Sequence, residues 1–226
     1  MTSPVAFLFD LDGTLVDSVY NHVRAWHVAL KENGLDLSVW RIHRKIGMSG
    51  GLFTTQLERE LGRPIDEAIL EKLRNRHAEL FRELSADVPP LPGAIELLQE
   101  LTKQRLPWAI ATSGRMRTAQ ANLQSLGVDP KTATVVTRDE VRYAKPDPDL
   151  FVEAARRLGT RTQSSYVIGD SIWDMYAAAR CGALGIGLLS GGYGEEELER
   201  AGAMRVFEDP ADMLLHLDEL APRTRA

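Results

Sequence analysis

The sequence has a single cysteine and no long hydrophobic segment. With Cys181 alone, the chain can form neither an intramolecular disulfide nor a cysteine-rich metal site, which is typical of proteins in a reducing compartment. No apolar run approaches the roughly 20 residues that span a bilayer, and no basic flank precedes the short apolar run at residues 5–9. We therefore expect a cytoplasmic protein that does not enter a membrane.

The chain also lacks an excess of positive charge. Its 27 lysine and arginine residues are outnumbered by 32 aspartate and glutamate residues, which gives a formal net charge of −5. Such a balance provides no general attraction for nucleic acid or for an anionic membrane, so neither is expected as a partner. Any phosphate must then be bound in a pocket, and 226 residues, 44% of them hydrophobic, can bury a core around one.

Short apolar runs alternate with amphipathic stretches after residue 106. This alternation predicts an α/β fold with a Rossmann-like parallel sheet. Right-handed crossovers would place helices on both faces of the sheet and ligands beyond the carboxyl ends of the strands. The predicted strands are residues 6–9, 108–111, 134–137, 166–168, 184–189 and 204–207. The predicted helices are residues 93–104, 117–126, 148–158, 173–180, 195–201 and 209–220.

The alternation is absent from residues 17–84, which contain no convincing strand and the pattern of four helices. In the first of these, Val19, Val23, Trp26 and Leu30 fall on one helical face. We therefore predict a small all-helical cap domain at residues 17–88, inserted after the first strand. The catalytic core would comprise residues 1–16 and 89–226, and the proline-rich residues 88–93 would form the returning linker.

Two acidic clusters follow predicted strands. Asp10 and Asp12 come directly after the first strand, and Asp170 and Asp174 follow residues 166–168 in the same way. Carboxylates this close repel one another unless a cation lies between them, and hard oxygen ligands suit Mg²⁺. We expect Asp10 and Asp12 to share the metal, with one of them offering its backbone carbonyl and keeping its side chain free for acid/base chemistry.

Two further segments bring phosphate-binding groups to the same edge of the predicted sheet. Thr112, Ser113 and Gly114 follow the second strand and precede a helix, which offers a hydroxyl and free backbone amides to an anion. Lys145 adds one cation. Each segment alone is more often a turn, a helix cap or a surface lysine. Together, in this order and spacing, they favour a phosphate site.

The Asp-x-Asp-Gly-Thr segment that begins at Asp10 resembles the first motif of the haloacid dehalogenase superfamily, and the resemblance covers nearly the whole chain. It implies that Asp10 is the nucleophile and that Asp12 is the general acid/base. It also implies that Thr112 binds the phosphoryl group and that Lys145 steadies the nucleophile and the phosphate. The implied metal ligands are Asp10, Asp12, Asp170 and, more weakly, Asp174.

The resemblance implies Mg²⁺-dependent hydrolysis of a small phosphorylated metabolite, such as a sugar phosphate or a phosphoglycolate-like acid, through a phospho-aspartate on Asp10. Relatives that cleave carbon–halogen or carbon–phosphorus bonds lack an acid/base aspartate at the position of Asp12, so neither activity is expected here. The protein would act as a monomer or a homodimer.

Residues of the predicted cap would contact the substrate. Ser18 and His22 resemble substrate-facing positions of sugar-phosphate mutases; the alternative is that Ser18 only caps a helix and His22 is exposed. The loop at residues 47–51 resembles the substrate-specificity loop of the cap, in which Gly47 and Ser49 would approach the substrate.

Two alternative functions remain open. Gly50 stands where sugar-phosphate mutases carry an arginine, and Leu80 replaces their cap lysine, which disfavours a mutase that uses the same intermediate. The other alternative is a noncatalytic binding module. Such a protein should have lost one of the residues that carry the chemistry, but all are present: Asp10, Asp12, Thr112, Lys145 and Asp170.

The basic run at residues 41–45 would either recruit an anionic leaving group or form a solvated helix face, and the latter is favoured. Arg115 and Arg117 are predicted to be surface charges.

Overall fold

Strand β1 lies at the centre of a six-stranded parallel sheet with the order β3-β2-β1-β4-β5-β6 in the computed structural model, which describes residues 5–220. Phe9 of β1 pairs with Ile110 of β2 on one side and with Ile168 of β4 on the other. The strand order thus changes direction at β1, and in such sheets the crevice beyond the strand ends at this point binds ligands. The strands are β1 Ala6–Phe9, β2 Trp108–Ala111, β3 Val135–Val136, β4 Ser165–Gly169, β5 Leu184–Leu188 and β6 Ala203–Phe207.

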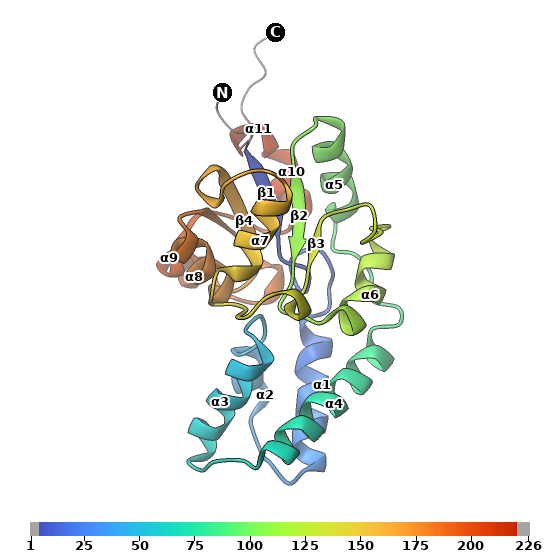
Figure 1. Cartoon of the computed structure of the whole chain (residues 1–226), viewed down its shortest axis with the longest axis vertical. Helices are drawn as coiled ribbons and strands as arrows, with labels where there is room; N and C mark the ends of the chain where they lie inside the picture. The colour runs from blue at the N-terminus through green and yellow to red at the C-terminus, as the bar shows by residue number, and fades with distance from the viewer. Residues whose placement is uncertain (1–4, 221–226) are drawn as a thin grey trace.

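Helices cover both faces of this sheet (Figure 1). Because side chains alternate along a strand, Phe7 and Phe9 pack on one face and Leu8 on the other. The face of Phe7 and Phe9 is covered by α5 Ala94–Lys103, α6 Met116–Ser125, α10 Pro210–Leu215 and α11 Leu217–Leu220. The face of Leu8 is covered by α7 Asp149–Arg157 and α8 Ile172–Cys181. Helix α9 Glu195–Ala201 packs beside α8. Short 3₁₀ turns are η1 Arg138–Glu140, η2 Thr162–Ser164 and η3 Leu189–Gly191. The predicted α/β fold is confirmed.

Most predicted elements differ from the structure by one residue at one or both ends, and two of the differences have a clear physical cause. The single helix predicted for residues 209–220 is two helices, because His216 adopts φ −111° and ψ 19°, outside helical geometry. Strand β3 is shorter than the predicted residues 134–137. It ends at Val136 because the backbone N–H of Thr137 donates to the Glu140 carboxylate, 2.9 Å away, and starts η1 instead.

Four helices between β1 and α5 form a helical segment that extends from the carboxyl edge of the sheet (Figure 1). They are α1 Val19–Glu32, α2 Val39–His43, α3 Gly50–Leu61 and α4 Glu67–Leu84. They share a hydrophobic core of their own that includes Trp26, Phe53 and Leu73. That residues 17–88 form a separate domain stays a prediction.

The two connections to this segment lie side by side. The backbone N–H of Leu91 donates to the carbonyl of Leu15 at 2.9 Å, and that of Asp17 donates to the carbonyl of Pro89 at 3.2 Å. The helical segment is therefore joined to the sheet through one paired connection. Among residues 5–220, no helix has the length and apolar character needed to cross a bilayer.

Candidate active site

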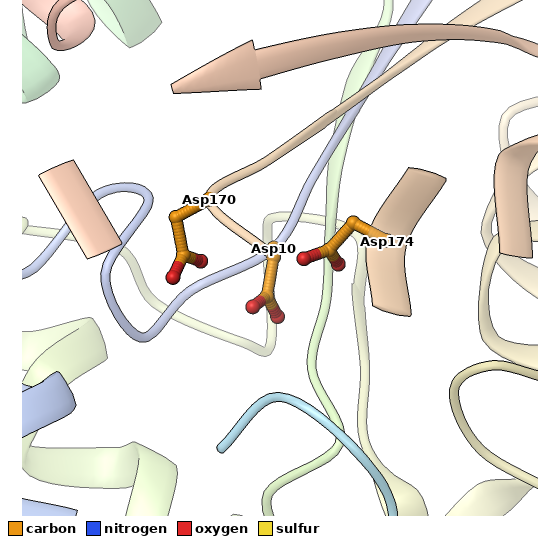
Figure 2. Close-up of side chains that lie close together, drawn as sticks. All are labelled: Asp10, Asp170 and Asp174. Carbon is orange, nitrogen blue, oxygen red and sulfur yellow. The ribbon is translucent and has the colours of Figure 1, made fainter. Parts of the chain in front are cut away.

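Three buried carboxylates meet at the carboxyl edge of the sheet (Figure 2). Asp10 directly follows β1, Asp170 directly follows the neighbouring strand β4, and Asp174 lies in the first turn of α8. One oxygen from each carboxylate lies within 4.8 Å of the others. The parallel pairing of β1 with β4 brings together residues that are 160 positions apart in the sequence.

Lys145 is the cation of this carboxylate cluster. Its fully buried Nζ forms an ion pair with Asp10 and lies 2.7 Å from Oδ1 of Asp174. Burial raises the pKa of Asp10 to about 7 despite the opposing effect of Lys145, and burial together with Asp174 raises the pKa of Asp170 well above its usual value. One lysine therefore does not balance three carboxylates. The hard oxygen donors and their uncompensated charge fit a divalent cation such as Mg²⁺.

The side chain of Asp12 lies apart from this cluster. Its Oδ1 accepts hydrogen bonds from Ser18 Oγ at 2.6 Å and from Asn122 Nδ2 at 2.8 Å, and lies 3.4 Å from Nε2 of His22. Burial would raise the pKa of Asp12, but His22 and Ser18 outweigh it and lower the pKa. Only the backbone carbonyl of Asp12 therefore remains as the predicted ligand for a metal at the cluster.

The turn at residues 112–114 faces the other oxygen of Asp12. A Cβ built on Gly114 would lie 3.8 Å from Oδ2 of Asp12, and Oδ2 accepts no hydrogen bond from residues 5–220. The backbone N–H of Gly114 donates to Oγ1 of Thr112 at 2.9 Å. The hydroxyl of Ser113 is buried and has no partner among the described residues. This turn therefore offers polar groups beside the one free oxygen of Asp12.

A cavity of about 340 Å³ lies between the sheet edge and the helical segment. It brings together most of the predicted site residues from both parts of the chain. Its lining includes Asp10, Asp12, Thr112, Ser113 and Gly114 from the core, and His22, Trp26, Gly47 and His77 from the helical segment.

Ser18 and His22 both turn toward Asp12. Ser18 stands at the N-cap position of α1, but its hydroxyl makes no capping hydrogen bond and donates to Asp12 instead. The His22 side chain is only 12% exposed, and its Nδ1 lies 3.1 Å from Nε2 of His77. The alternative interpretations of these residues, a helix-capping Ser18 and an exposed His22, are therefore wrong.

Gly47 and Ser49 differ in their positions. Gly47 lines the cavity with φ +90°, and a Cβ there would lie 2.7 Å from Oγ of Ser171. Ser49 is not among the lining residues; its hydroxyl accepts a hydrogen bond from the N–H of Leu52 at 3.3 Å and caps α3. Of the two, only Gly47 stands where a substrate could approach it.

The basic residues of the run at residues 41–45 differ in exposure. Arg41 is exposed on α2, as predicted for a solvated helix face, whereas Lys45 is buried and forms an ion pair with Glu60. Arg115 and Arg117 are exposed, as predicted for surface charges, and both also line the cavity.

Asn122 and His77 are the site residues that sequence reasoning missed. Asn122 is 1% exposed on α6, beside the buried residues Ala119 and Leu123. A polar side chain on the apolar face of an amphipathic helix is the signal that could have identified it. His77 gave no such signal, because its partner His22 lies on another helix.

Comparisons with known proteins agree with this geometry. The haloacid dehalogenase-like hydrolase family matches residues 5–182. The chain is 36% identical over 167 residues to hexitol phosphatase A of Escherichia coli (strain K12). This alignment covers 73% of this chain and 74% of that protein. It is 30% identical over 216 residues to a phosphoglycolate phosphatase of Rhodospirillum rubrum, covering 93% and 89%.

Solved structures show the same similarity. The crystal structure of a hydrolase from Pseudomonas syringae superposes with a TM-score of 0.95 at 55% identity, covering 96% of this chain and all of that one. The family match spans both acidic segments and Lys145. This chain is therefore a member of the haloacid dehalogenase-like hydrolase family.

Proposed function

We propose that this protein is a Mg²⁺-dependent phosphatase that hydrolyses small phosphate monoesters through a phospho-aspartate on Asp10. The observation that carries the proposal is the position of Asp10. It belongs to the carboxylate cluster, pairs with Lys145 and lines a cavity that also contains the turn at residues 112–114. Relatives named as phosphatases of hexitol phosphate and phosphoglycolate support the same reaction class.

The carboxylates of Asp10, Asp170 and Asp174, with the backbone carbonyl of Asp12, would hold the Mg²⁺. When bound, the ion would offset the repulsion between the Asp10 carboxylate and a phosphate dianion. The chemical donors of the chain fit this task, since all are hard oxygen atoms.

The remaining steps belong to side chains of the chain itself. A carboxylate oxygen of Asp10 attacks phosphorus, and the bond from phosphorus to the alcohol oxygen breaks. Asp12, which must be protonated on its free Oδ2 when the substrate is bound, gives this proton to that oxygen and later takes one from the water that attacks the phospho-aspartate. Inorganic phosphate leaves and Asp10 is restored. Thr112 and Lys145 would hold the phosphoryl oxygens throughout.

The cap surface favours hydrolysis over a mutase reaction. Gly50 lines the cavity and has no side chain, so it cannot take the part of the arginine that the mutases carry at this position. Leu80 packs against the hydrophobic core of the helical segment. No basic group at either position would retain a bisphosphate for return of the phosphoryl group.

The test is phosphate release from a panel of alkyl and aryl phosphate esters with Mg²⁺, with EDTA, and with the Asp10→Asn variant. We expect turnover with Mg²⁺ only, and none from Asp10→Asn. The exposed Asp17→Asn serves as the control, because it removes a nearby carboxylate outside the cavity. Turnover that survives Asp10→Asn would refute the proposed nucleophile.

A further inference from the structure

The cavity is strongly asymmetric in charge. Its only lining carboxylates within residues 5–220 are Asp10 and Asp12, both at the end where the chemistry is proposed. Elsewhere the lining is basic. The lining cations are Lys45, Arg74, Arg115, Arg117 and Arg138.

Three of these five cations are paired with carboxylates. Lys45 pairs with Glu60 and Arg74 pairs with Glu67. Arg115 Nη1 lies 3.1 Å from a carboxylate oxygen of Asp139. Arg138 has no carboxylate partner among residues 5–220, but its Nη1 donates to the backbone carbonyl of Val141 at 2.6 Å, which directs that charge at the protein.

Arg117 is held more weakly than the other four. Its Nη2 lies 3.4 Å from the neutral side-chain amide oxygen of Asn75, and no carboxylate in the described part of the chain pairs with it. Arg117 belongs to α6 of the core, whereas Asn75 belongs to α4, so the guanidinium bridges the two walls of the cavity. Burial, His22 and Arg117 hold the pKa of His77 well below its usual value. His77 is therefore neutral, and Arg117 is the lining cation with the weakest protein partner.

The aromatic side chains beside Arg117 are occupied by one another. Trp26 stacks on Phe53 with ring centroids 4.1 Å apart and on His77 at 4.2 Å. The indole N–H of Trp26 donates to no acceptor among residues 5–220. Trp26 therefore offers the cavity a hydrogen-bond donor, which suits a hydroxyl group of the leaving group.

From these contacts, and resting on the proposed phosphatase function, we propose that the substrate is a phosphate monoester of a hydroxy-carboxylic acid. The phosphate would lie at the turn of residues 112–114, the carboxylate on Arg117, and hydroxyls near Trp26 and His77. A guanidinium binds a carboxylate through two parallel hydrogen bonds. An arginine without a carboxylate partner matches an anionic group on the leaving group. The cavity volume is at the low end of the roughly 300–1,000 Å³ typical of small-molecule sites.

The relatives also differ in whether the leaving group of the substrate that they are named for carries a carboxylate. A hexitol phosphate has a neutral leaving group, whereas phosphoglycolate carries a carboxylate, and proteins named for both resemble this chain. The charge on Arg117 favours the acidic class. Neither relative's name decides the matter for this chain.

The test compares gluconate 6-phosphate with glucitol 6-phosphate, which differ only in a carboxylate against a hydroxymethyl group at carbon 1. We expect kcat/KM to be about tenfold or more higher for the acid, as for one charge-assisted hydrogen-bonded pair. Arg117→Gln should bring this ratio close to one. Arg115→Gln removes the same charge from a side chain that faces Asp139, so it should keep most of the ratio.

Binding to Asp10→Asn, measured by calorimetry with Mg²⁺, separates this inference from the proposed function. A lower Kd for the acid, lost on adding Arg117→Gln, supports the inference even if the wild-type protein hydrolyses no ester; in that case only the proposed phosphatase function fails. Equal hydrolysis of both esters, or a preference that survives Arg117→Gln, overturns the inference and leaves the phosphatase function standing.

Discussion

At the scale of single residues, the two carboxylate oxygens of Asp12 have different surroundings. Oδ1 accepts hydrogen bonds from Ser18 and Asn122 and faces His22, while Oδ2 faces Gly114 without a partner among the described residues. Fixing one oxygen orients the carboxylate and leaves the other for the proton transfer we propose. Asn122 is then a positioning residue that acts through Asp12.

We therefore predict that Asn122→Ala lowers kcat for alkyl phosphates about tenfold, because one hydrogen bond to a charged group is lost. Aryl phosphates with good leaving groups should lose less, since their departure needs little protonation. Measuring kcat for both ester types gives the ratio. Gln124→Ala is the control, because this exposed side chain on the same helix makes no hydrogen bond within the described structure. Equal losses for both esters would show that Asn122 only fills space.

At the scale of elements, the loop around Gly47 meets the first turn of α8. Its neighbour Arg44 accepts hydrogen bonds at its carbonyl from Trp173 Nε1 at 3.2 Å and from the Tyr193 hydroxyl at 3.0 Å. The positive φ of Gly47 and its closeness to Ser171 leave no space for a side chain. The contacts of Arg44 and Gly47 therefore hold the helical segment against the core beside the carboxylate cluster.

Gly47→Ala is expected to displace this loop. The left-handed backbone conformation alone costs a non-glycine residue about 1–2 kcal/mol, and the clash with Ser171 adds to it. We predict that the free energy of unfolding falls by at least about 1 kcal/mol, measured with urea, and that kcat/KM falls with it. In Gly51→Ala the added Cβ meets nothing within 4 Å and lies within α3, so stability should stay or rise. A stable, fully active Gly47→Ala protein would contradict this role of the loop.

At the scale of the whole molecule, the carboxylate cluster links stability to pH and metal. In the metal-free protein the pKa of Asp10 rises from 3.8 to about 7 through burial, and burial raises that of Asp170 well above its usual value. The folded protein then keeps protons that the unfolded chain has lost, so stability falls as pH rises between these values. A divalent cation binds the deprotonated carboxylates and opposes this fall.

We predict that Tm in EDTA decreases from about pH 5 to about pH 8, and that Mg²⁺ raises Tm most at the higher pH. An ion at 100 times its Kd adds about 2.7 kcal/mol to the stability of the folded state. Thermal unfolding followed by circular dichroism measures this shift. The control Asp170→Asn should abolish most of the Mg²⁺ effect, and a Tm that Mg²⁺ leaves unchanged at high pH would speak against the metal site.

The fold class and family follow from local patterns in the sequence, and both predictions are confirmed. Apolar runs such as residues 6–9 and 166–168 have the length of buried strands, and parallel pairing carries the residues that follow them to one edge. The sequence alone therefore predicts that Asp10 and Asp170 lie together. The roles of these residues stay predictions that the experiments above address.

The tertiary structure alone decided which way the polar side chains face. Ser18, Asn122 and His22 converge on Asp12 because α1 and α6 meet at the end of β1, and no spacing in the sequence encodes that meeting. Helix packing likewise places Arg117 at the cavity wall. The hydroxyl of Ser49 caps α3 instead of facing the cavity. The sheet and the acidic strand ends could be predicted from the sequence because they depend on local periodicity, and the family could be predicted from the motif that begins at Asp10. Side-chain partners depend on the packing of distant elements, so only the folded chain determined them.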